Sequence, residues 1–243
     1  MTSTQPQNPY ALTPITLRLS VVVPCFNERD TVNELIDRVQ AVPIDKQVIV
    51  VDDCSTDGSR DLLEKRLEER GDIVLCLRER NGGKGAAVQD GLKQASGDVV
   101  IIQDADLEYD PADYPLVLRP IQTGKTKVVY GSRFLGEHKA MYFWHSVGNK
   151  TLTLLCNVLF DTTLTDMETC YKAFTIDIAR QLRLREPGWG FDPEITARIL
   201  RMGHRIYEVP ISYAGREFDE GKKISWRDGF VVLMTLVRYR FLP

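Results

Sequence analysis

Residues Val99 to Asp106 read V-V-I-I-Q-D-A-D, an apolar run that ends in two aspartates separated by one residue. A short continuous run of β-branched residues predicts a strand that is buried on both faces. Side chains at positions i and i+2 of an extended segment point the same way, so Asp104 and Asp106 can face one cation. Mg²⁺ and Mn²⁺ prefer carboxylate and phosphate oxygens. The motif predicts a divalent metal that also binds a diphosphate; a solvated turn with helix-capping aspartates is the alternative.

The same pattern recurs upstream of this motif. Buried strands are predicted at Arg18 to Cys25, Gln47 to Val51 and Ile73 to Leu77, with helical spacing of apolar residues between them. Alternating strands and helices predict βαβ units, and hence an α/β, Rossmann-like, mainly parallel sheet flanked by helices. Ligands bind beyond the carboxyl ends of such strands. Polar residues follow three of the four strands at that edge: Asn27 and Glu28, Asp52 and Asp53, and Asp104 and Asp106.

The alternation weakens after Pro111, although the chain still reads as one folded unit. We expect a polar, flexible leader over residues 1–16, one α/β domain over residues 17–225, and a C-terminal amphipathic helix over residues 226–243. Further predicted elements are a strand at Lys127 to Tyr130, helices at His145 to Phe160 and Pro193 to Met202, and a strand at Arg205 to Pro210.

The amino-acid composition restricts the classes of function that the protein can have. The 243 residues carry a net charge of −3, which gives no bulk electrostatic case for binding nucleic acid. No apolar run is long enough to predict a membrane-spanning helix. Five cysteines without a C-x-x-C pair favour a reducing compartment over a disulfide framework or a zinc site. We therefore expect a cytoplasmic protein that is soluble or lies on a membrane surface.

Two further motifs accompany the Asp104 motif. Asp53 follows a buried strand, and its carboxylate can accept hydrogen bonds from a base or a ribose hydroxyl, although one of Asp52 and Asp53 can equally cap the next helix. The loop Asn81 to Gly85 reads N-G-G-K-G, in which glycines allow close backbone approach to phosphate and Lys84 supplies charge. The spacing of an NTPase phosphate-binding loop is missing, and no G-x-G-x-x-G follows the first strand, which argues against a dinucleotide dehydrogenase.

Taken together, the ordered motifs resemble the inverting glycosyltransferase family 2 of GT-A fold, in particular the dolichyl-phosphate mannose synthase and polyprenyl-phosphate glycosyltransferase branch. The resemblance covers roughly Leu19 to Arg240. The motifs that carry it are V-V-V-P-C-F-N-E (21–28), V-D-D-C-S-T-D-G-S (51–59), N-G-G-K-G (81–85), D-A-D-L-E (104–108), G-S-R-F (131–134) and D-M-E-T-C-Y-K (166–172).

The resemblance implies a role for each matching position. A nucleotide-sugar donor would be bound by Pro24, Phe26, Glu28, Val51, Asp53, Lys84, Asp104, Ala105, Asp106, Arg133, Arg216 and Lys222. Asp104, Asp106 and Glu108 would hold Mg²⁺ or Mn²⁺, and Arg133 would contact phosphate. The sequence departs from the family at Phe26, where tyrosine is commoner, at Glu108, where mannose synthases often carry glutamine, and at G-K-K-I (221–224), where the family reads G-K-S-K-like.

The leading interpretation is transfer of a hexose from a GDP-mannose or UDP-glucose type of donor to a polyprenyl phosphate, with inversion. A metal with Arg and Lys side chains would stabilise the charge on the leaving diphosphate. A phosphate acceptor scarcely needs a general base, and Arg133 and Lys172 would offset its charge. A saccharide or protein hydroxyl acceptor would need one, for which Asp166 and Glu168 are candidates. A non-catalytic sugar-nucleotide-binding regulator is the third reading; a nucleotidyltransferase would show a different glycine-rich signature near the first strand.

A lipid acceptor requires contact with a membrane. The stretch Phe230 to Phe241 is too short to span a bilayer but long enough to lie in its interface, and Met141 to Trp144 is a second apolar, aromatic candidate. Packing of both against the sheet is the alternative. We expect a peripheral location on the cytoplasmic face, and a separate membrane-anchoring subunit is a candidate partner.

Overall fold

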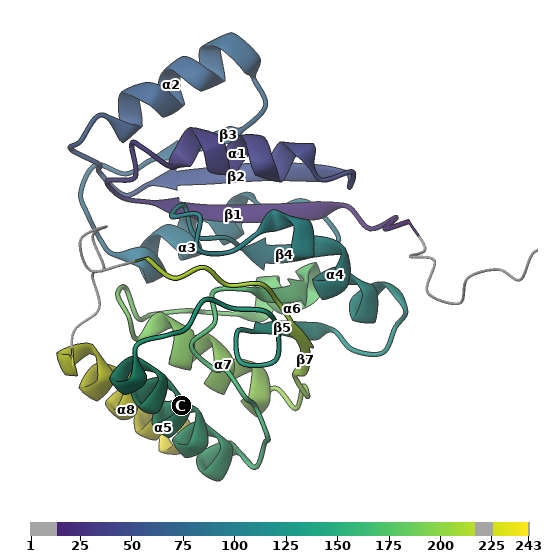
Figure 1. The fold of residues 1–243 in the computed structure, drawn as a ribbon, viewed down its shortest axis with the longest axis vertical. Helices are drawn as coiled ribbons and strands as arrows, with labels where there is room; N and C mark the ends of the chain where they lie inside the picture. Colours follow the sequence, from purple (N-terminus) through teal and green to yellow (C-terminus); the bar gives the residue numbers. More distant parts are fainter. Residues whose placement is uncertain (1–13, 217–225, 243) are drawn as a thin grey trace, which may run out of the picture.

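A computed structural model describes residues 14–216 and 226–242 of the chain. It contains one seven-stranded sheet of order β3-β2-β1-β4-β6-β5-β7, flanked by helices (Figure 1). The strands are β1 (Leu19–Cys25), β2 (Lys46–Asp52), β3 (Val74–Leu77), β4 (Val99–Ile102), β5 (Val128–Ser132), β6 (Lys172–Thr175) and β7 (Tyr207–Pro210). The helices are α1 (Val32–Ala41), α2 (Ser59–Arg70), α3 (Lys84–Gln94), α4 (Tyr114–Gln122), α5 (Phe143–Phe160), α6 (Ile176–Gln181), α7 (Phe191–Arg201) and α8 (Trp226–Phe241), with a 3₁₀ turn η1 (Pro111–Asp113).

The first half of the sheet is the predicted parallel βαβ assembly. Strand β1 pairs in parallel with β2 on one side and β4 on the other, and β2 pairs in parallel with β3. All four residues of β4 are buried, as is nearly all of β1. This burial on both faces explains the continuous apolar runs, and it places Asp104 and Asp53 at one edge of the sheet.

Two residues with positive φ shape the helix starts in this half. Helix α1 begins at Val32 and not directly after β1, because Asn27 has a φ of 55° and its side chain and backbone bond the 55–56 turn. Residues Ser55 to Asp57 do not cap α2 directly. Gly58, with a φ of 96°, precedes the helix, and Asp57 accepts a hydrogen bond from the Ser59 amide instead.

The second half contains a reversal that the sequence does not reveal. Strand β6 runs antiparallel to both β4 and β5, whereas β7 is parallel to β5. The helices α4 and α6 are likewise additions to the predicted elements. Because β6 runs backwards, the segment that leads into it, residues 166–171, arrives at the same edge of the sheet as the ends of β1, β2 and β4.

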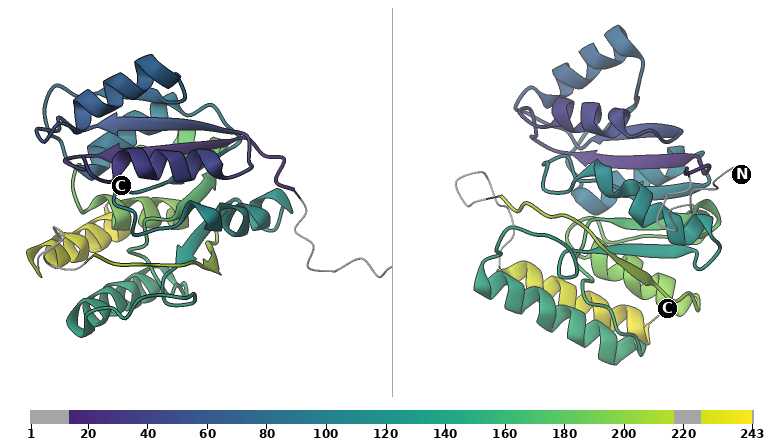
Figure 2. Two further views of the ribbon diagram at one scale, coloured as in Figure 1. Left: turned by 45° about the horizontal axis from the view of Figure 1, so that its top comes forward. Right: turned by 45° about the vertical axis from the view of Figure 1, so that its right-hand side comes forward.

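Helices α5 and α8 lie side by side beyond the sheet (Figures 1 and 2). They enclose a small second core formed by Cys156, Leu164, Met167, Val232 and Leu236. Helix α8 begins at the predicted residue, Trp226, and ends at Phe241, two residues before the predicted end. Residues 1–13 of the expected leader lie outside the described residues. Its last residues are tied to α4: the Thr16 amide donates to Gln122 Oε1 at 2.7 Å, and Gln122 Nε2 donates to the Pro14 carbonyl.

Candidate active site

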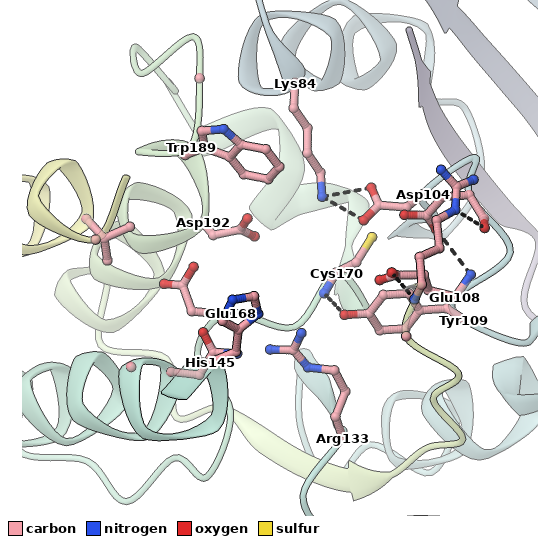
Figure 3. A pocket seen from close by; sticks show the side chains of 18 of the residues that line it. Lys84, Asp104, Glu108, Tyr109, Arg133, His145, Glu168, Cys170, Trp189 and Asp192 are labelled. Atoms are coloured by element: carbon pink, nitrogen blue, oxygen red, sulfur yellow. Dashed lines mark hydrogen bonds and ion pairs between the residues drawn. The ribbon is translucent and has the colours of Figure 1, made fainter. Parts of the chain in front are cut away.

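A cavity of about 1460 Å³ opens at the carboxyl edge of the sheet. Its walls come from the ends of β1, β2 and β4, the start of α3, and the helices α5 and α8 (Figure 3). Eleven of the residues predicted to bind the donor or the metal line it: Pro24, Phe26, Glu28, Asp53, Lys84, Asp104, Ala105, Asp106, Glu108, Arg133 and Arg216.

Asp104 and Asp106 form an anionic centre in this cavity. Lys84 Nζ lies 2.7 Å from Asp104 Oδ1 and 2.8 Å from Oδ2, so the lysine of the glycine loop meets the end of β4. Burial opposes the charge of Lys84, but the attraction of Asp104 together with that of Cys170 and Asp192 outweighs burial and raises the lysine pKa well above its ordinary value. Burial and the charges of Asp104 and Glu108 raise the pKa of Asp106 to about 8. This concentration of negative charge favours a bound cation.

The third predicted metal ligand is engaged elsewhere. Glu108 Oε2 accepts a hydrogen bond from the Tyr213 hydroxyl at 2.9 Å, and Oε1 accepts one from the Arg216 amide at 2.8 Å. Within residues 14–216 and 226–242, no three His, Cys, Asp or Glu side chains are grouped so as to hold a metal ion. Mg²⁺ and Mn²⁺ commonly use one or two carboxylates together with substrate phosphates and water. Asp104 and Asp106 fit that pattern, and Glu108 instead fixes the 213–216 segment.

The predicted nucleotide side of the cavity is held by internal bonds. Glu28 Oε2 pairs with Arg216 Nη2 at 2.7 Å, so the C-terminal segment closes against the end of β1. Asp53 accepts hydrogen bonds from the Gly82 and Gly83 amides at 2.9 and 2.7 Å, which makes it the anchor of the glycine loop. The Val51 side chain is fully buried in the core and does not line the cavity. Lys222 lies outside the described residues.

Arg133 and Asp166 form one buried unit. Arg133 Nε and Nη2 each lie 2.7 Å from a different carboxylate oxygen of Asp166, and the Arg133 amide also donates to it at 3.0 Å. Asp166 is fully buried and does not line the cavity, whereas Arg133 does. Asp166 therefore positions Arg133, and its geometry does not suit the role of general base that was predicted for it with a hydroxyl acceptor.

The remaining residues of the 166–172 motif lie on another wall. Lys172, expected to face an acceptor phosphate, is fully buried and donates to the Thr169 carbonyl and, at 2.5 Å, to Asp192 Oδ1. Glu168 lines the cavity beside Asp192. Burial and the charge of Asp192 raise the pKa of Glu168 to about 8. Lys172 therefore does not face the cavity, but bonds Asp192, which lines it.

Sequence reasoning missed several residues that face the cavity, among them Tyr109, His145, Trp189 and Asp192 (Figure 3). Trp189 and Asp192 belong to the stretch G-W-G-F-D (188–192) directly before and into α7. An aromatic residue between two glycines and an acid at a helix start form a detectable signal. His145 lies near the start of α5, and the mainly apolar sequence around it gave no signal of a functional residue.

The fold and the site define a GT-A-like α/β protein with an acidic, metal-compatible centre at its ligand edge. The family model described as glycosyl transferase family 2 matches residues 20–183, more than half of the chain. The chain is 30% identical over 216 residues to the undecaprenyl-phosphate mannosyltransferase of Micrococcus luteus, covering 85% of this chain and 87% of that protein. This chain belongs to glycosyl transferase family 2, which confirms the predicted family.

Two further comparisons agree with this assignment. The dodecaprenyl-phosphate galacturonate synthase of Rhizobium johnstonii is 29% identical over 240 residues, covering 93% of this chain and 69% of that protein. Glucosyl-3-phosphoglycerate synthase of Mycobacterium tuberculosis, solved with Mn²⁺, UDP and glucosyl-3-phosphoglycerate, superposes with a TM-score of 0.72 at 23% identity, covering 93% of this chain and 81% of that chain. The structural likeness confirms the predicted GT-A fold.

Proposed function

We propose that this enzyme transfers a hexose from a nucleotide-diphospho-sugar to a polyprenyl phosphate, with inversion at the anomeric carbon. The observation that carries the proposal is the continuity of the cavity. It runs from the carboxylates of Asp104 and Asp106 to apolar side chains of α5 and α8, among them Leu152, Leu155, Phe230 and Leu233. One end suits a charged donor and the other suits an isoprenoid chain. The two polyprenyl-phosphate-dependent relatives support the same assignment.

The chain's own residues account for most of the chemistry. Asp104 and Asp106 would hold a divalent metal, which when bound offsets charge on the leaving diphosphate. Lys84 and Arg133 place two further cations in the cavity walls, where they stabilise the same developing charge and offset repulsion by an anionic acceptor. Asp166 keeps Arg133 extended toward the cavity. An acceptor phosphate carries its own nucleophilic oxygen, so no side chain has to remove a proton from it.

A transfer assay tests this function. Radiolabelled GDP-mannose and UDP-glucose are each incubated with undecaprenyl or dolichyl phosphate in detergent, with Mn²⁺ or with a chelator. We expect label in the organic phase with at least one donor, and loss of that label with the chelator. Transfer only to saccharide or protein hydroxyls would support the second acceptor class. Tight metal-dependent donor binding without any turnover would support the non-catalytic regulator.

We also propose that α5 and α8 contact the membrane that contains the acceptor, on its cytoplasmic face. Among the described residues, no helix has the length and apolarity to cross a bilayer. The two helices nevertheless present large exposed side chains at helical spacing, here called the apolar face: Phe143, Val147, Leu154 and Val158 on α5, and Phe230, Met234, Val237 and Phe241 on α8. Exposed patches of this kind mark interaction surfaces.

Vesicle sedimentation tests the apolar face. Leu154 is 62% exposed and Val158 is 74% exposed, and neither lines the cavity. Replacing both with glutamine should weaken binding to anionic phospholipid vesicles about tenfold or more, because each loses roughly 1.5–3 kcal/mol of apolar transfer. Leu67→Gln on the distant helix α2 is the matched control. If the wild-type protein stays in the supernatant, direct docking is contradicted and a membrane-anchoring subunit becomes the better explanation.

A further inference from the structure

One wall of the cavity carries two carboxyl groups and an indole. Glu168, Asp192 and Trp189 all line the cavity, and together we call them the acidic corner. In Figure 3 they lie across the cavity from Glu108 and Tyr109, with Lys84, Cys170 and Arg133 between. The roles proposed so far for the diphosphate and the acceptor phosphate use none of the three side chains.

The cations around the acidic corner are already paired. The Lys172 ammonium bonds Asp192 and the Thr169 carbonyl, Lys84 bonds Asp104, and Arg133 bonds Asp166. Glu168 Oε1 is buried and has no hydrogen-bond partner among the described residues. The raised pKa of Glu168, about 8, reflects the burial of this carboxyl and its nearness to Asp192. A buried carboxyl oxygen without a partner is costly, so a ligand group that bonds to it would bind there favourably.

The acidic corner lies where a donor sugar has to go. Lys84 joins the two regions, because its Nζ bonds Asp104 and lies 5.8 Å from the ring centre of Phe191, the residue before Asp192. In the sheet, the ends of β1 and β2, which precede Glu28 and Asp53, lie on one side of the end of β4, whereas β6, which follows the segment with Glu168, lies on the other side. A diphosphate at Asp104 and Asp106 therefore leaves its sugar on the side of Glu168, Asp192 and Trp189.

We propose that the acidic corner is the sugar subsite and that it selects an uncharged hexose over a uronic acid. Hydroxyl groups of a neutral hexose can donate to Glu168 and Asp192, and the Trp189 ring offers an apolar surface to the C–H face of the sugar. A uronate would bring a third carboxyl group to a wall whose neighbouring cations, Lys172, Lys84 and Arg133, are already paired, and its charge would be left without a partner. This inference rests on the proposed function and narrows its donor.

Donor pairs that differ only at the sugar carboxyl test the inference on the wild-type enzyme. Binding with Mn²⁺ is measured by titration calorimetry for UDP-glucose against UDP-glucuronate, UDP-galactose against UDP-galacturonate, and GDP-mannose against GDP-mannuronate, with UDP and GDP alone as references. In the pair that carries the preferred base and sugar, we expect the uronate to bind roughly 100-fold more weakly than the neutral hexose. Equal or tighter binding of the uronate would overturn the inference and leave the proposed function intact. Failure of every nucleotide and nucleotide sugar to bind would contradict the proposed function itself.

Two variants locate the selectivity in the acidic corner. Asp192→Asn frees the Lys172 ammonium, so the ratio of uronate to hexose affinity should rise at least tenfold, while UDP or GDP alone binds as before. Glu168→Ala removes a hydroxyl partner and should weaken hexose binding about tenfold, with Glu168→Gln retaining most of the affinity. The control Glu64→Gln lies on the exposed surface of α2. Unchanged hexose affinity in Glu168→Ala together with lost turnover would instead make Glu168 a base and overturn the sugar-binding role.

Discussion

Replacing Asp104 and Asp106 together with asparagine is expected to lower sugar transfer about 1000-fold or more. Asparagine keeps the shape of each side chain but removes both negative charges, so the site would lose its affinity for a divalent cation. Without that cation the leaving diphosphate loses its main source of charge stabilisation, an effect of the size seen when preorganised electrostatic partners are removed. Initial rates at saturating donor and Mn²⁺ measure the change.

The same double variant should also lose the Mn²⁺ dependence of nucleotide binding. Asp61→Asn, on the exposed surface of α2 away from the cavity, is the matched control and should keep full activity. The melting temperature of each protein checks that the fold is retained. Transfer rates within tenfold of wild type in the double variant would contradict the placement of the metal and the diphosphate at the end of β4.

Replacing Asp166 with asparagine is expected to destabilise the protein by about 3 kcal/mol or more. The buried guanidinium of Arg133 would keep its charge and lose its carboxylate partner, and removing one member of a buried ion pair typically costs 3–5 kcal/mol. Urea unfolding followed by circular dichroism measures the change. Turnover should fall as well, because Arg133 would no longer be held toward the cavity.

An exposed ion pair that also contains an aspartate provides the control. Asp177 pairs with Lys127 at 2.7 Å, with about half of each side chain in contact with solvent. Asp177→Asn should therefore cost less than about 1 kcal/mol. If Asp166→Asn were equally mild in its effect on stability while abolishing turnover, Asp166 would act directly in the reaction and its positioning role would be wrong.

The first half of the fold could be predicted because its signals are local. Strands β1, β2 and β4 are buried on both faces, and such strands need continuous apolar runs that are visible without knowing their neighbours. Strand β6 reads K-A-F-T, too short and too mixed to stand out, and its buried lysine argues against a strand. Its direction depends on pairing with β4 and β5, which no local pattern records.

The candidate site divides in the same way. The acids at the end of β4 and the glycine loop could be predicted because the residue types in each motif indicate what they can bind. Contacts between residues far apart in the sequence could not be predicted, because residue type does not show which group a side chain meets. Lys172 was expected to face a phosphate, yet it pairs with Asp192, 20 residues further on. Glu108 was expected to bind metal, yet it fixes Tyr213 and Arg216, more than 100 residues away.

The late, antiparallel addition of β6 to the sheet has a consequence for synthesis on the ribosome. The four strands β1 to β4 are complete once residue 102 has emerged, but one side of β4 stays open until residues 172–175 follow. An unpaired strand edge of apolar sequence invites pairing with other chains. The ribosome must therefore add some 70 residues before β6 can cover this edge of β4. During that interval, chaperone binding would protect the half-sheet that already carries Asp104.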